Sequence, residues 1–295
     1  MRAPGRSRFG FFVVFEPSYS LGCLAALSSL VRHASRPIAV DVLMRAQYRR
    51  AADEVIDKLK RKYGDRLVLR AVVVPPAILD QCDNFNFRAH FIAEILFRLY
   101  YFDIVESRSD YVIYLDLDMI LMVDIFSIEQ DLGHAALLHV VEAKMQDASR
   151  GVMPPHISRY LNSGLLVFDT TDSAALGQAL LKARHIVNEI AEKAQFLDQD
   201  AINIAFYDKL EYLPRKWNFT LEEFTGYPLP GDTAVLHATG SRKPWFFRGG
   251  HPFSMWYEKE ADLLELTFLG RYDFWWAARR LATRLKRLPD ARRLR

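Results

Sequence analysis

Two aspartates near the middle of the chain have the spacing most suggestive of chemistry. Asp116 and Asp118 follow a nearly apolar run, residues 111–115, which is typical of a strand buried on both faces. Residues two apart in an extended backbone point to the same side, so both carboxylates reach one point if the extended geometry continues. Two converging carboxylates are costly unless a cation neutralises them, and oxygen ligands suit Mg²⁺ or Mn²⁺. The spacing therefore predicts a divalent metal site; the alternative is a turn cap at Asp118 beside a solvated Asp116.

A histidine far along the chain is a candidate third ligand. His237 ends the short apolar run 234–236 and is expected at a strand end. One imidazole with two carboxylates favours Mn²⁺ over Mg²⁺, which prefers oxygen. Just downstream, Gly240 would let backbone N–H groups approach a phosphate, and Lys243 would add a positive charge. The alternatives are a histidine bonded to backbone and a solvated lysine.

A strand ending in Asp-x-Asp also resembles the first motif of haloacid-dehalogenase-type phosphatases, whose first aspartate is the nucleophile. That motif usually lies near the N-terminus and precedes Thr or Gly. Here it lies in mid-chain and precedes Met119 and Ile120. A phosphatase with Asp116 as nucleophile is therefore the weaker hypothesis.

The elements expected to position these residues alternate between strands and helices. Short strands separated by helix-length segments are typical of βαβ units and a mostly parallel sheet. The expected strands are residues 9–15, 38–44, 67–74, 111–116, 135–141, 164–169 and 234–237. The expected helices are residues 19–32, 48–62, 87–105, 173–193, 198–207 and 254–268. Residues 142–160 lack periodicity and are expected to form a long loop beside a binding site.

Five segments, taken in order, make the chain from about Phe9 to Trp245 resemble glycosyltransferase family 8, which are retaining enzymes with a GT-A fold. The segments are Arg98-Leu99, Tyr114-Leu-Asp-Leu-Asp118, Leu161-Asn-Ser-Gly164, Asp198-Gln-Asp-Ala-Ile-Asn203 and His237-Ala-Thr-Gly-Ser-Arg-Lys-Pro-Trp245. The resemblance implies an α/β fold of GT-A type, with a Rossmann-like, mostly parallel sheet flanked by helices. It also implies Mn²⁺-dependent transfer of a hexose, such as galactose or glucose, from a UDP-sugar.

The resemblance also implies roles for individual residues. The metal ligands would be Asp116, Asp118 and His237. The residues contacting the donor would be Tyr19, Arg98, Asn162, Gly164, Gly240 and Lys243. Residues 15–19 depart from the family's usual pattern, which makes the base that Tyr19 would stack on less certain than the chemistry. Locally, Arg98 also suits a surface position and residues 162–164 also suit a turn.

Three residues near position 199 are the predicted catalytic group. By resemblance Asp198 would hold sugar hydroxyls, Gln199 would lie near the anomeric carbon, and Asp200 would stabilise positive charge on the sugar. An amide is a poor nucleophile, so front-face transfer through an oxocarbenium-like state is expected, with the leaving phosphate helping to deprotonate the acceptor. Asp198 as a helix N-cap is the local alternative.

The charge distribution divides the chain into two predicted parts. The whole chain of 295 residues has a formal net charge of +3. Residues 271–295 contain nine Lys and Arg against two acids, which leaves 30 basic and 34 acidic residues in 1–270. A mildly acidic body argues against nucleic acid as a partner. We therefore expect a GT-A catalytic domain over 1–270 and a separate tail over 271–295.

The tail has the pattern of a basic amphipathic helix. Its apolar residues recur at spacings of four and three, at Phe274, Ala278, Leu281, Leu285 and Leu288. Such a helix suits an anionic membrane surface, where the enzyme would meet a lipid-linked or oligosaccharide acceptor such as lipopolysaccharide core. The alternatives are a partner-docking helix and a helix packed on the body.

The expected location is the cytoplasm, at the inner face of the cytoplasmic membrane. Cys23 and Cys82 provide no disulfide framework, which favours a reducing compartment. No run approaches the roughly 18–20 apolar residues of a membrane span. A non-catalytic nucleotide-sugar-binding protein is the remaining alternative, and the intact metal ligands argue against it.

Overall fold

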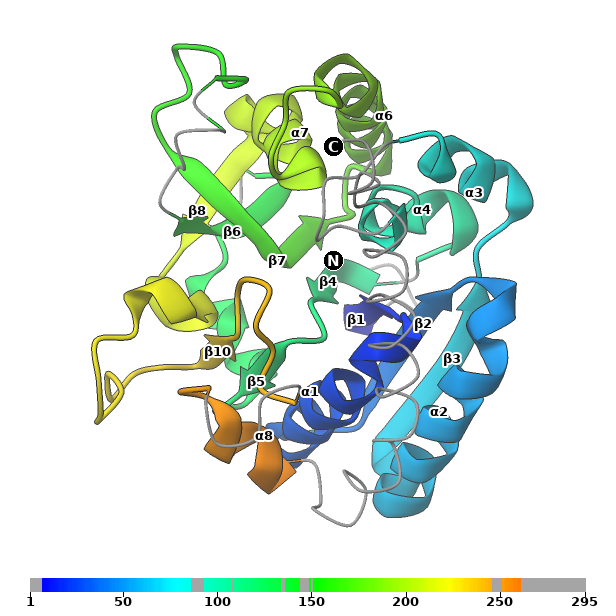
Figure 1. The fold of residues 1–295 in the computed structure, drawn as a ribbon, viewed down its shortest axis with the longest axis vertical. Helices are drawn as coiled ribbons and strands as arrows, with labels where there is room; N and C mark the ends of the chain where they lie inside the picture. Colours follow the sequence, from blue (N-terminus) through cyan, green and yellow to red (C-terminus); the bar gives the residue numbers. More distant parts are fainter. Residues whose placement is uncertain are drawn as a thin grey trace, which may run out of the picture.

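A seven-stranded sheet runs through the centre of the protein, as the computed structural model shows (Figure 1). The structure describes residues 7–85, 93–107, 109–133, 136–143, 149, 151–245 and 251–260. In order across the sheet, the strands are β3 (Leu67–Val73), β2 (Ile38–Met44), β1 (Ser7–Val14), β4 (Ser109–Leu115), β7 (Tyr160–Asp169), β6 (Leu138–Ala143) and β8 (Leu210–Leu213). Only β7 is antiparallel to its neighbours. The sheet is therefore mostly parallel, which confirms the predicted fold class.

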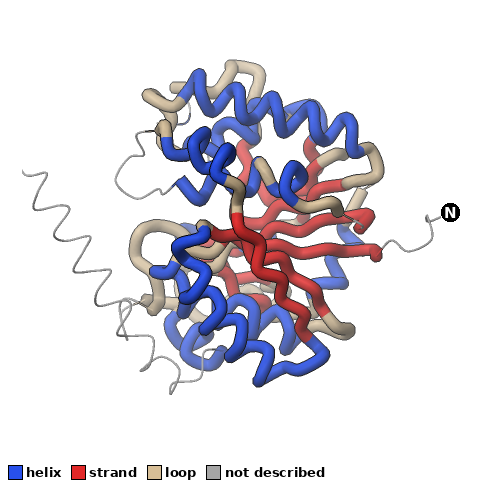
Figure 2. Tube along the Cα trace, turned by 90° about the vertical axis from the view of Figure 1, so that its right-hand side faces the viewer, coloured by secondary structure: helices blue, strands red, loops and turns tan. Residues whose placement is uncertain are grey.

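Helices cover both faces of this sheet (Figure 2). One face packs on α1 (Ser20–His33) and α2 (Arg49–Tyr63), and the other on α6 (Ser173–Ile190) and α7 (Leu197–Ala205). The alternation of strand side chains divides the apolar residues between two cores: Phe11 and Val13 join the first, and Phe12 joins the second. All seven residues of β4 are buried, as expected for a central strand.

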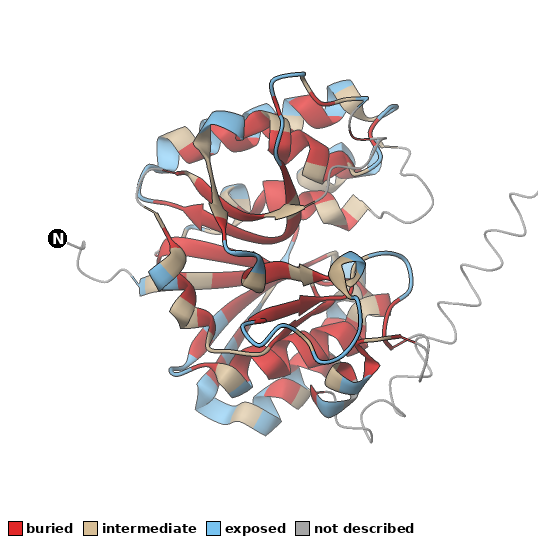
Figure 3. Ribbon diagram, turned by 90° about the vertical axis from the view of Figure 1, so that its left-hand side faces the viewer, coloured by how far each residue is buried: buried red, intermediate tan, exposed pale blue. Residues whose placement is uncertain are grey.

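A second, three-stranded sheet carries part of the site. Its order is β5 (Met119–Leu121), β10 (Val235–His237) and β9 (Phe219–Thr220). β5 begins directly after Asp118, and its antiparallel register sets His237 opposite Met119. This pairing brings the two parts of the chain that carry predicted metal ligands side by side. The strands of both sheets are largely buried (Figure 3).

Shorter elements connect these layers. The remaining α-helices are α3 (Pro76–Asp83), α4 (Tyr101–Ile104) and α8 (Ser254–Glu260). The 3₁₀ helices are η1 (Pro17–Tyr19), η2 (Ala46–Tyr48), η3 (Gly64–Arg66), η4 (Ala93–Leu99), η5 (Ile125–Asp131), η6 (Tyr207–Lys209), η7 (Arg215–Asn218) and η8 (Leu221–Glu223). Among the described residues, no helix is both long and apolar enough to cross a membrane.

Several predicted boundaries were wrong. The helix predicted over 87–105 is instead the 3₁₀ helix η4 followed by the one-turn α4, with residues 86–92 outside the described part. The strand predicted over 164–169 begins at Tyr160, because β7 pairs with β6 along residues 141–143 and shortens the predicted loop. α3, β5, β8 and β9 were not predicted. The predicted helix 254–268 is α8 as far as Glu260; the rest of it and the tail 271–295 lie outside the described residues.

Candidate active site

A cavity of about 1180 Å³ lies where the carboxyl ends of β1 and β4 meet the three-stranded sheet. Its wall includes Glu16 after β1, Asp116 after β4, and residues of β9 and β10. In α/β sheets, ligands bind outside the carboxyl ends of the strands. Of the twelve predicted site residues, all but Asp200 line this cavity.

The three predicted metal ligands meet in this cavity. One ligand atom each of Asp116, Asp118 and His237 lies within 4.8 Å of the others. The Nε2 atom of His237 is 3.2 Å from Asp118 Oδ1 and 3.7 Å from Asp116 Oδ2. The two carboxylates converge although the extended geometry does not continue across them: β4 ends at Leu115 and Asp118 lies in a turn. The turn is fixed to the small sheet by the Ala238 N–H, which donates to Asp118 O at 2.9 Å.

The far oxygen of each carboxylate is held by a neighbouring side chain. Asp116 Oδ1 accepts hydrogen bonds from the Tyr114 hydroxyl and, at 3.3 Å, from Arg98 Nη2. Asp118 Oδ2 accepts one from Lys243 Nζ. The atoms left over, Asp116 Oδ2 and Asp118 Oδ1, are those nearest His237.

The donor set fits a divalent cation. Asp118 Oδ1 is buried and has no hydrogen-bond partner among the described residues. A buried carboxylate oxygen without a partner is costly, and a cation bound between it, Asp116 and His237 would satisfy it. Two carboxylates with one imidazole are suitable ligands for a first-row divalent metal. These three residues therefore form a candidate divalent-metal site.

The buried charges push the pKa values of the carboxyls apart. Burial raises the pKa of Asp116 above its usual range, although Arg98 partly offsets it. Burial also opposes ionisation of Asp118, but Lys243 and His237 outweigh it and hold the pKa of that carboxyl well below its usual range. A bound cation favours the charged form of both groups.

Lys243 is buried rather than solvated, which rejects the alternative interpretation of this residue. Its side chain is 8% exposed, and its Nζ also donates to Ala238 O at 2.9 Å. The preceding Gly240 has a φ of +83°, a left-handed conformation that favours glycine. Tyr19 completes this wall, with its ring centroid 5.9 Å from Lys243 Nζ and its pKa raised to about 12 by burial.

Arg98 is likewise buried and not a surface residue. Its Nη1 donates to Ser163 O at 2.7 Å, and its Nε lies 3.4 Å from Asp198 Oδ2. Together with the bond to Asp116, these contacts hold two carboxylates of the cavity wall with one guanidinium. Burial raises the pKa of Asp198, and Arg98 partly offsets this.

The Asn-Ser-Gly segment lies within β7 and does not form the turn that was considered. Asn162 Oδ1 accepts hydrogen bonds from the Gly164 N–H at 2.9 Å and from Asn218 Nδ2 at 2.8 Å. A Cβ at Gly164 would lie 2.4 Å from His237 Cε1 and 2.8 Å from Met119 Cε. The position of the imidazole therefore leaves no room for a side chain at residue 164.

Asp198 and Gln199 lie in the first turn of α7, and the N-cap is Phe196, so the capping alternative for Asp198 is wrong. Gln199 Oε1 accepts from Ser163 N–H at 2.9 Å, and its Nε2 donates to the Tyr160 hydroxyl at 3.0 Å. These bonds hold the amide at the cavity wall.

Asp200 is not brought to the cavity. It is fully buried and accepts hydrogen bonds from the Tyr160 hydroxyl and, at 3.2 Å, from the Phe196 N–H. Asp200 was predicted to stabilise positive charge on the sugar, and its place behind Tyr160 means that it would not do so by direct contact: this carboxylate holds Tyr160, which in turn holds Gln199. The helical spacing explains this placement, because consecutive residues of a helix point in different directions.

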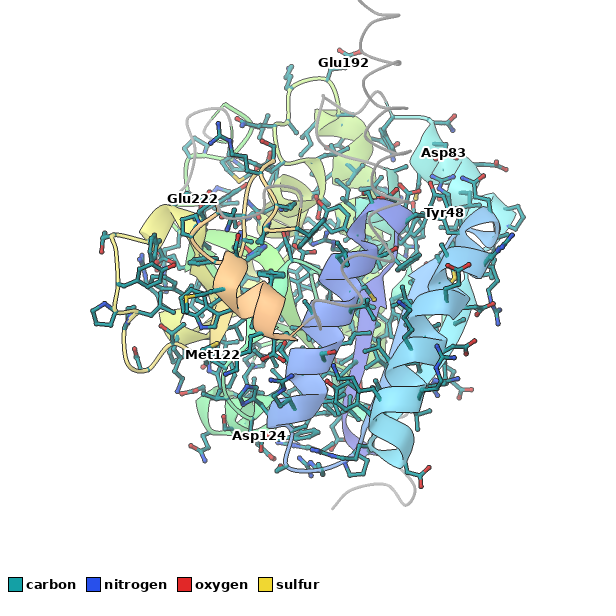
Figure 4. All side chains as sticks on the ribbon, turned by 60° about the horizontal axis from the view of Figure 1, so that its bottom comes forward. Tyr48, Asp83, Met122, Asp124, Glu192 and Glu222 are labelled. Atoms are coloured by element: carbon teal, nitrogen blue, oxygen red, sulfur yellow. The ribbon has the colours of Figure 1, made fainter. Side chains whose placement is uncertain are left out.

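Other functional residues were missed. Tyr114 was quoted only as part of a motif, and Asn218 was not considered, because its contacts with Asn162 and His237 join parts of the chain distant in sequence. Further carboxylates line the cavity, among them Glu94 and Glu222. Glu222 is labelled in Figure 4. Glu222 accepts a hydrogen bond from the Thr239 hydroxyl at 2.7 Å.

The fold and site together are those of a GT-A glycosyltransferase. The sequence profile described as "Glycosyl transferase family 8" matches residues 11–249, and the chain belongs to this family. It is therefore an enzyme that uses a nucleotide-sugar donor and a glycan acceptor, as predicted. Family membership contradicts the phosphatase hypothesis for Asp116 and the hypothesis of a non-catalytic binding protein.

Individual relatives agree with this placement. The chain is 23% identical over 279 residues to a lipopolysaccharide 1,2-glucosyltransferase of Escherichia coli, covering 85% of this chain and 80% of the relative. It is 22% identical over 174 residues to a lipopolysaccharide 1,3-galactosyltransferase of Salmonella typhimurium, covering 55% of this chain and 52% of that one.

Solved structures share the fold. The galactosyltransferase LgtC, in complex with donor and acceptor sugar analogs, superposes with a TM-score of 0.69 at 18% identity, covering 85% of this chain and 95% of LgtC. The glycosyltransferase GlyE of Streptococcus pneumoniae superposes with a TM-score of 0.60 at 18% identity, covering 92% of this chain and 64% of GlyE.

Proposed function

We propose that this enzyme transfers glucose or galactose from a UDP-sugar to a lipopolysaccharide core or similar glycan, with retention of anomeric configuration. The proposal is carried by the convergence of Asp116, Asp118 and His237 beside a buried Lys243 in the cavity of a family 8 chain. Relatives named as lipopolysaccharide glucosyl- and galactosyltransferases support the sugar and the acceptor class.

The proposed cation is Mn²⁺, with Mg²⁺ as the alternative. The imidazole of His237 supports this choice, because Mg²⁺ prefers an all-oxygen shell. When bound, the ion would act as a Lewis acid that stabilises negative charge on the departing diphosphate. The chain supplies a second positive charge for the same purpose: Lys243 Nζ contacts Asp118 and stays beside the metal ligands. The left-handed Gly240 leaves its backbone open to a phosphate without a side chain in the way.

The sugar would be held on the opposite wall. Asp198 and Asn162 line the cavity and would bind sugar hydroxyls, while Arg98 keeps Asp198 and Asp116 in place. Tyr19, on the wall near Lys243, would contact the base or ribose.

Transfer on the front face is the proposed chemistry. Gln199 offers only an amide, and Asp200 lies behind Tyr160, so no carboxylate suited to attack the anomeric carbon lines that wall from α7 except the ion-paired Asp198. The bond from the anomeric carbon to the phosphate oxygen breaks, and the bond to the acceptor oxygen forms on the same face through an oxocarbenium-like state. The acceptor proton passes to the leaving phosphate, which balances the charges. A covalent sugar trapped on Asp200 and detected by mass spectrometry would overturn this scheme.

A panel of nucleotide sugars tests the proposed function. We expect UDP-glucose or UDP-galactose to release UDP in the presence of Mn²⁺, and the release to be faster when core oligosaccharide is added. Nuclear magnetic resonance of the product should show the donor's anomeric configuration. The Asp118→Asn variant should lose this activity, because it removes a ligand charge. Failure of every donor to bind or turn over, or an inverted product, would refute the proposal.

We further propose that residues 1–270 form the catalytic part and that 271–295 attach it to an anionic membrane at the cytoplasmic face. This tail contains nine basic residues and two acids, which supports the attachment. The free, buried Cys23 and Cys82 agree with a reducing compartment. Full-length protein should sediment with anionic but not with neutral vesicles. Replacing Arg279, Arg280 and Arg284 by Gln should weaken sedimentation. A chain of residues 1–270 that still sediments fully would contradict the proposal.

A further inference from the structure

A hydrogen-bonded chain of two asparagines stands behind the imidazole of His237. His237 Nδ1 lies 2.9 Å from Asn218 Oδ1, and Asn218 Nδ2 lies 2.8 Å from Asn162 Oδ1. Resting on the proposed function, we infer that Asn218 is a positioning residue that holds the hydrogen of His237 on Nδ1 and so keeps Nε2 available to the metal.

The direction of every bond in this chain follows from one backbone group. The Gly164 N–H donates at 2.9 Å to the side chain of Asn162. A backbone N–H is always a donor, so the Asn162 atom that it meets must be the carbonyl oxygen. That same oxygen faces Asn218 at 2.8 Å, so Asn218 must present its NH₂ group there. The Asn218 carbonyl oxygen is then the atom that faces His237, and it can only accept.

His237 must therefore donate from Nδ1. This assignment places the hydrogen on the nitrogen away from the two aspartates. The other nitrogen, Nε2, lies 3.2 Å from Asp118 Oδ1 and 3.7 Å from Asp116 Oδ2. A hydrogen bond to the remote nitrogen is the usual way in which a protein fixes the tautomer and the ring plane of a metal-binding histidine.

Packing prevents other arrangements. Asn218 is 1% exposed and His237 is 4% exposed, so water does not easily replace a lost bond. The ring of His237 also packs against Gly164, where a Cβ would lie 2.9 Å from Nδ1. The hydrogen-bonded side chains come from β7, η7 and β10, so both the main sheet and the small sheet determine the position of the imidazole.

Two substitutions at Asn218 separate hydrogen bonding from packing. Asn218→Leu removes the acceptor at nearly the same volume, whereas Asn218→Asp keeps an oxygen facing Nδ1. We expect the leucine variant to bind Mn²⁺ 10- to 100-fold more weakly, the usual cost of losing such a partner. The aspartate variant keeps the acceptor for Nδ1 but sets its second oxygen against Asn162 Oδ1, so it should lose less affinity than the leucine variant. The amplitude of the electron paramagnetic resonance signal of free Mn²⁺ measures this affinity without any turnover.

Asn203→Leu is the matched control. Asn203 is a fully buried asparagine that accepts from the Leu161 N–H at 2.9 Å and donates to Gln199 O at 2.8 Å, so its partners are neither His237 nor Asn218. Its substitution also removes buried hydrogen bonds, but Mn²⁺ affinity should not change more than about twofold. Circular dichroism on all variants confirms that they fold.

The position of the hydrogen can be read directly. In metal-free wild type, at a pH high enough for the spectra to show a neutral imidazole, long-range ¹H–¹⁵N spectra should show His237 with its hydrogen on Nδ1. In Asn218→Leu the Nε2–H form should appear. A wild-type His237 with hydrogen on Nε2, or equal Mn²⁺ affinity in wild type and Asn218→Leu, would overturn the inference. Failure of the wild type to bind Mn²⁺ would instead count against the proposed function, and the spectra would still decide the tautomer.

Discussion

Gly164 shows how much of the site depends on the absence of one carbon atom. It lies in β7, its carbonyl oxygen accepts from the Asp116 N–H at 2.8 Å, and its own N–H donates to the Asn162 side chain. On its other side, the imidazole of His237 occupies the space that a side chain would need. The same glycine thus determines both the ring's position and the orientation of the amide chain behind it.

We expect Gly164→Ala to displace His237 and weaken metal binding. The new Cβ would lie 2.4 Å from His237 Cε1, so the ring must move, and overpacking of this kind costs about 1–3 kcal/mol of stability. Mn²⁺ affinity should fall at least tenfold, and donor turnover should fall with it. Mn²⁺ titration and urea unfolding measure the two effects.

Gly177→Ala provides the control for that variant. Gly177 is an exposed position inside α6, where an added Cβ meets nothing within 4 Å. Alanine there should raise the free energy of unfolding by about 0.5–1 kcal/mol and leave Mn²⁺ binding alone. If Gly164→Ala binds Mn²⁺ as tightly as Gly177→Ala does, then Gly164 does not position the imidazole.

At this scale the sequence predicts residue types better than their contacts. The carboxylates Asp116 and Asp118 are recognisable from local spacing beside an apolar run, and their convergence was foreseen. The role of Asn218 was not, because it depends on bonds to residues 56 and 19 positions away. Asp200 was misassigned for the same reason: whether a side chain on α7 faces the cavity or Tyr160 is decided by how the helix packs on β7.

At the scale of elements, the small sheet decides where His237 lies. β5, β9 and η7 are each two to four residues long, so their sequences alone carry little signal. β5 pairs with β10 across more than a hundred residues, and β9 pairs with β10 on its other side. The long, strongly apolar strands of the main sheet were predictable from local pattern; the short strands that complete the site needed the tertiary contacts.

A hydrogen bond and an ion pair, both to Asp131, connect η7 to η5. They allow the contribution of this contact to stability to be tested. Asp131 Oδ2 accepts from the indole N–H of the buried Trp217 at 2.7 Å and lies 2.8 Å from Lys216 Nζ. Burial opposes ionisation of Asp131, but these two donors outweigh it and lower its pKa. The pKa of Asp131 in the folded protein is therefore below its value of about 3.9 in the unfolded chain. The stability that ionised Asp131 contributes is complete above the unfolded pKa and is lost as the pH falls through the folded pKa.

Asp131→Asn should therefore lower the free energy of unfolding by about 1–2 kcal/mol at neutral pH. The difference from wild type should stay constant from about pH 7 to pH 5 and shrink below about pH 4. Urea unfolding followed by tryptophan fluorescence measures it. A difference that grows as the pH falls would show that Asp131 does not stabilise the fold in its charged form.

At the scale of the whole molecule, ligands should stabilise the fold because the site joins both sheets. The proposed metal ligands come from the end of β4 and from β10, and Asn162 comes from β7. Any ligand that binds this set only in the folded state shifts unfolding by mass action.

We expect Mn²⁺ with UDP, at about a hundredfold excess over Kd, to stabilise the wild type by about 2.7 kcal/mol, a rise of several degrees in Tm. UDP without a divalent ion should give a smaller rise, because the ion links the diphosphate to the carboxylates. Differential scanning fluorimetry measures both. In Asp116→Asn the additional effect of Mn²⁺ should disappear; an undiminished effect would place the ion elsewhere.

The two sides of the cavity differ in how freely they can vary. The ligand side is anchored by buried groups such as Arg98 and Lys243, each with several partners. Another part of the wall, here called the rim, is lined by a loop residue, Ser158, and by residues of the short 3₁₀ helices η7 and η8, such as Arg215 and Glu222. We expect mutations on that rim to leave the anchored side intact, so successive generations could acquire new recipient glycans while the proposed sugar-releasing chemistry is inherited unchanged. The same division offers a rational starting point for directed evolution: diversify the rim and leave the anchored side alone.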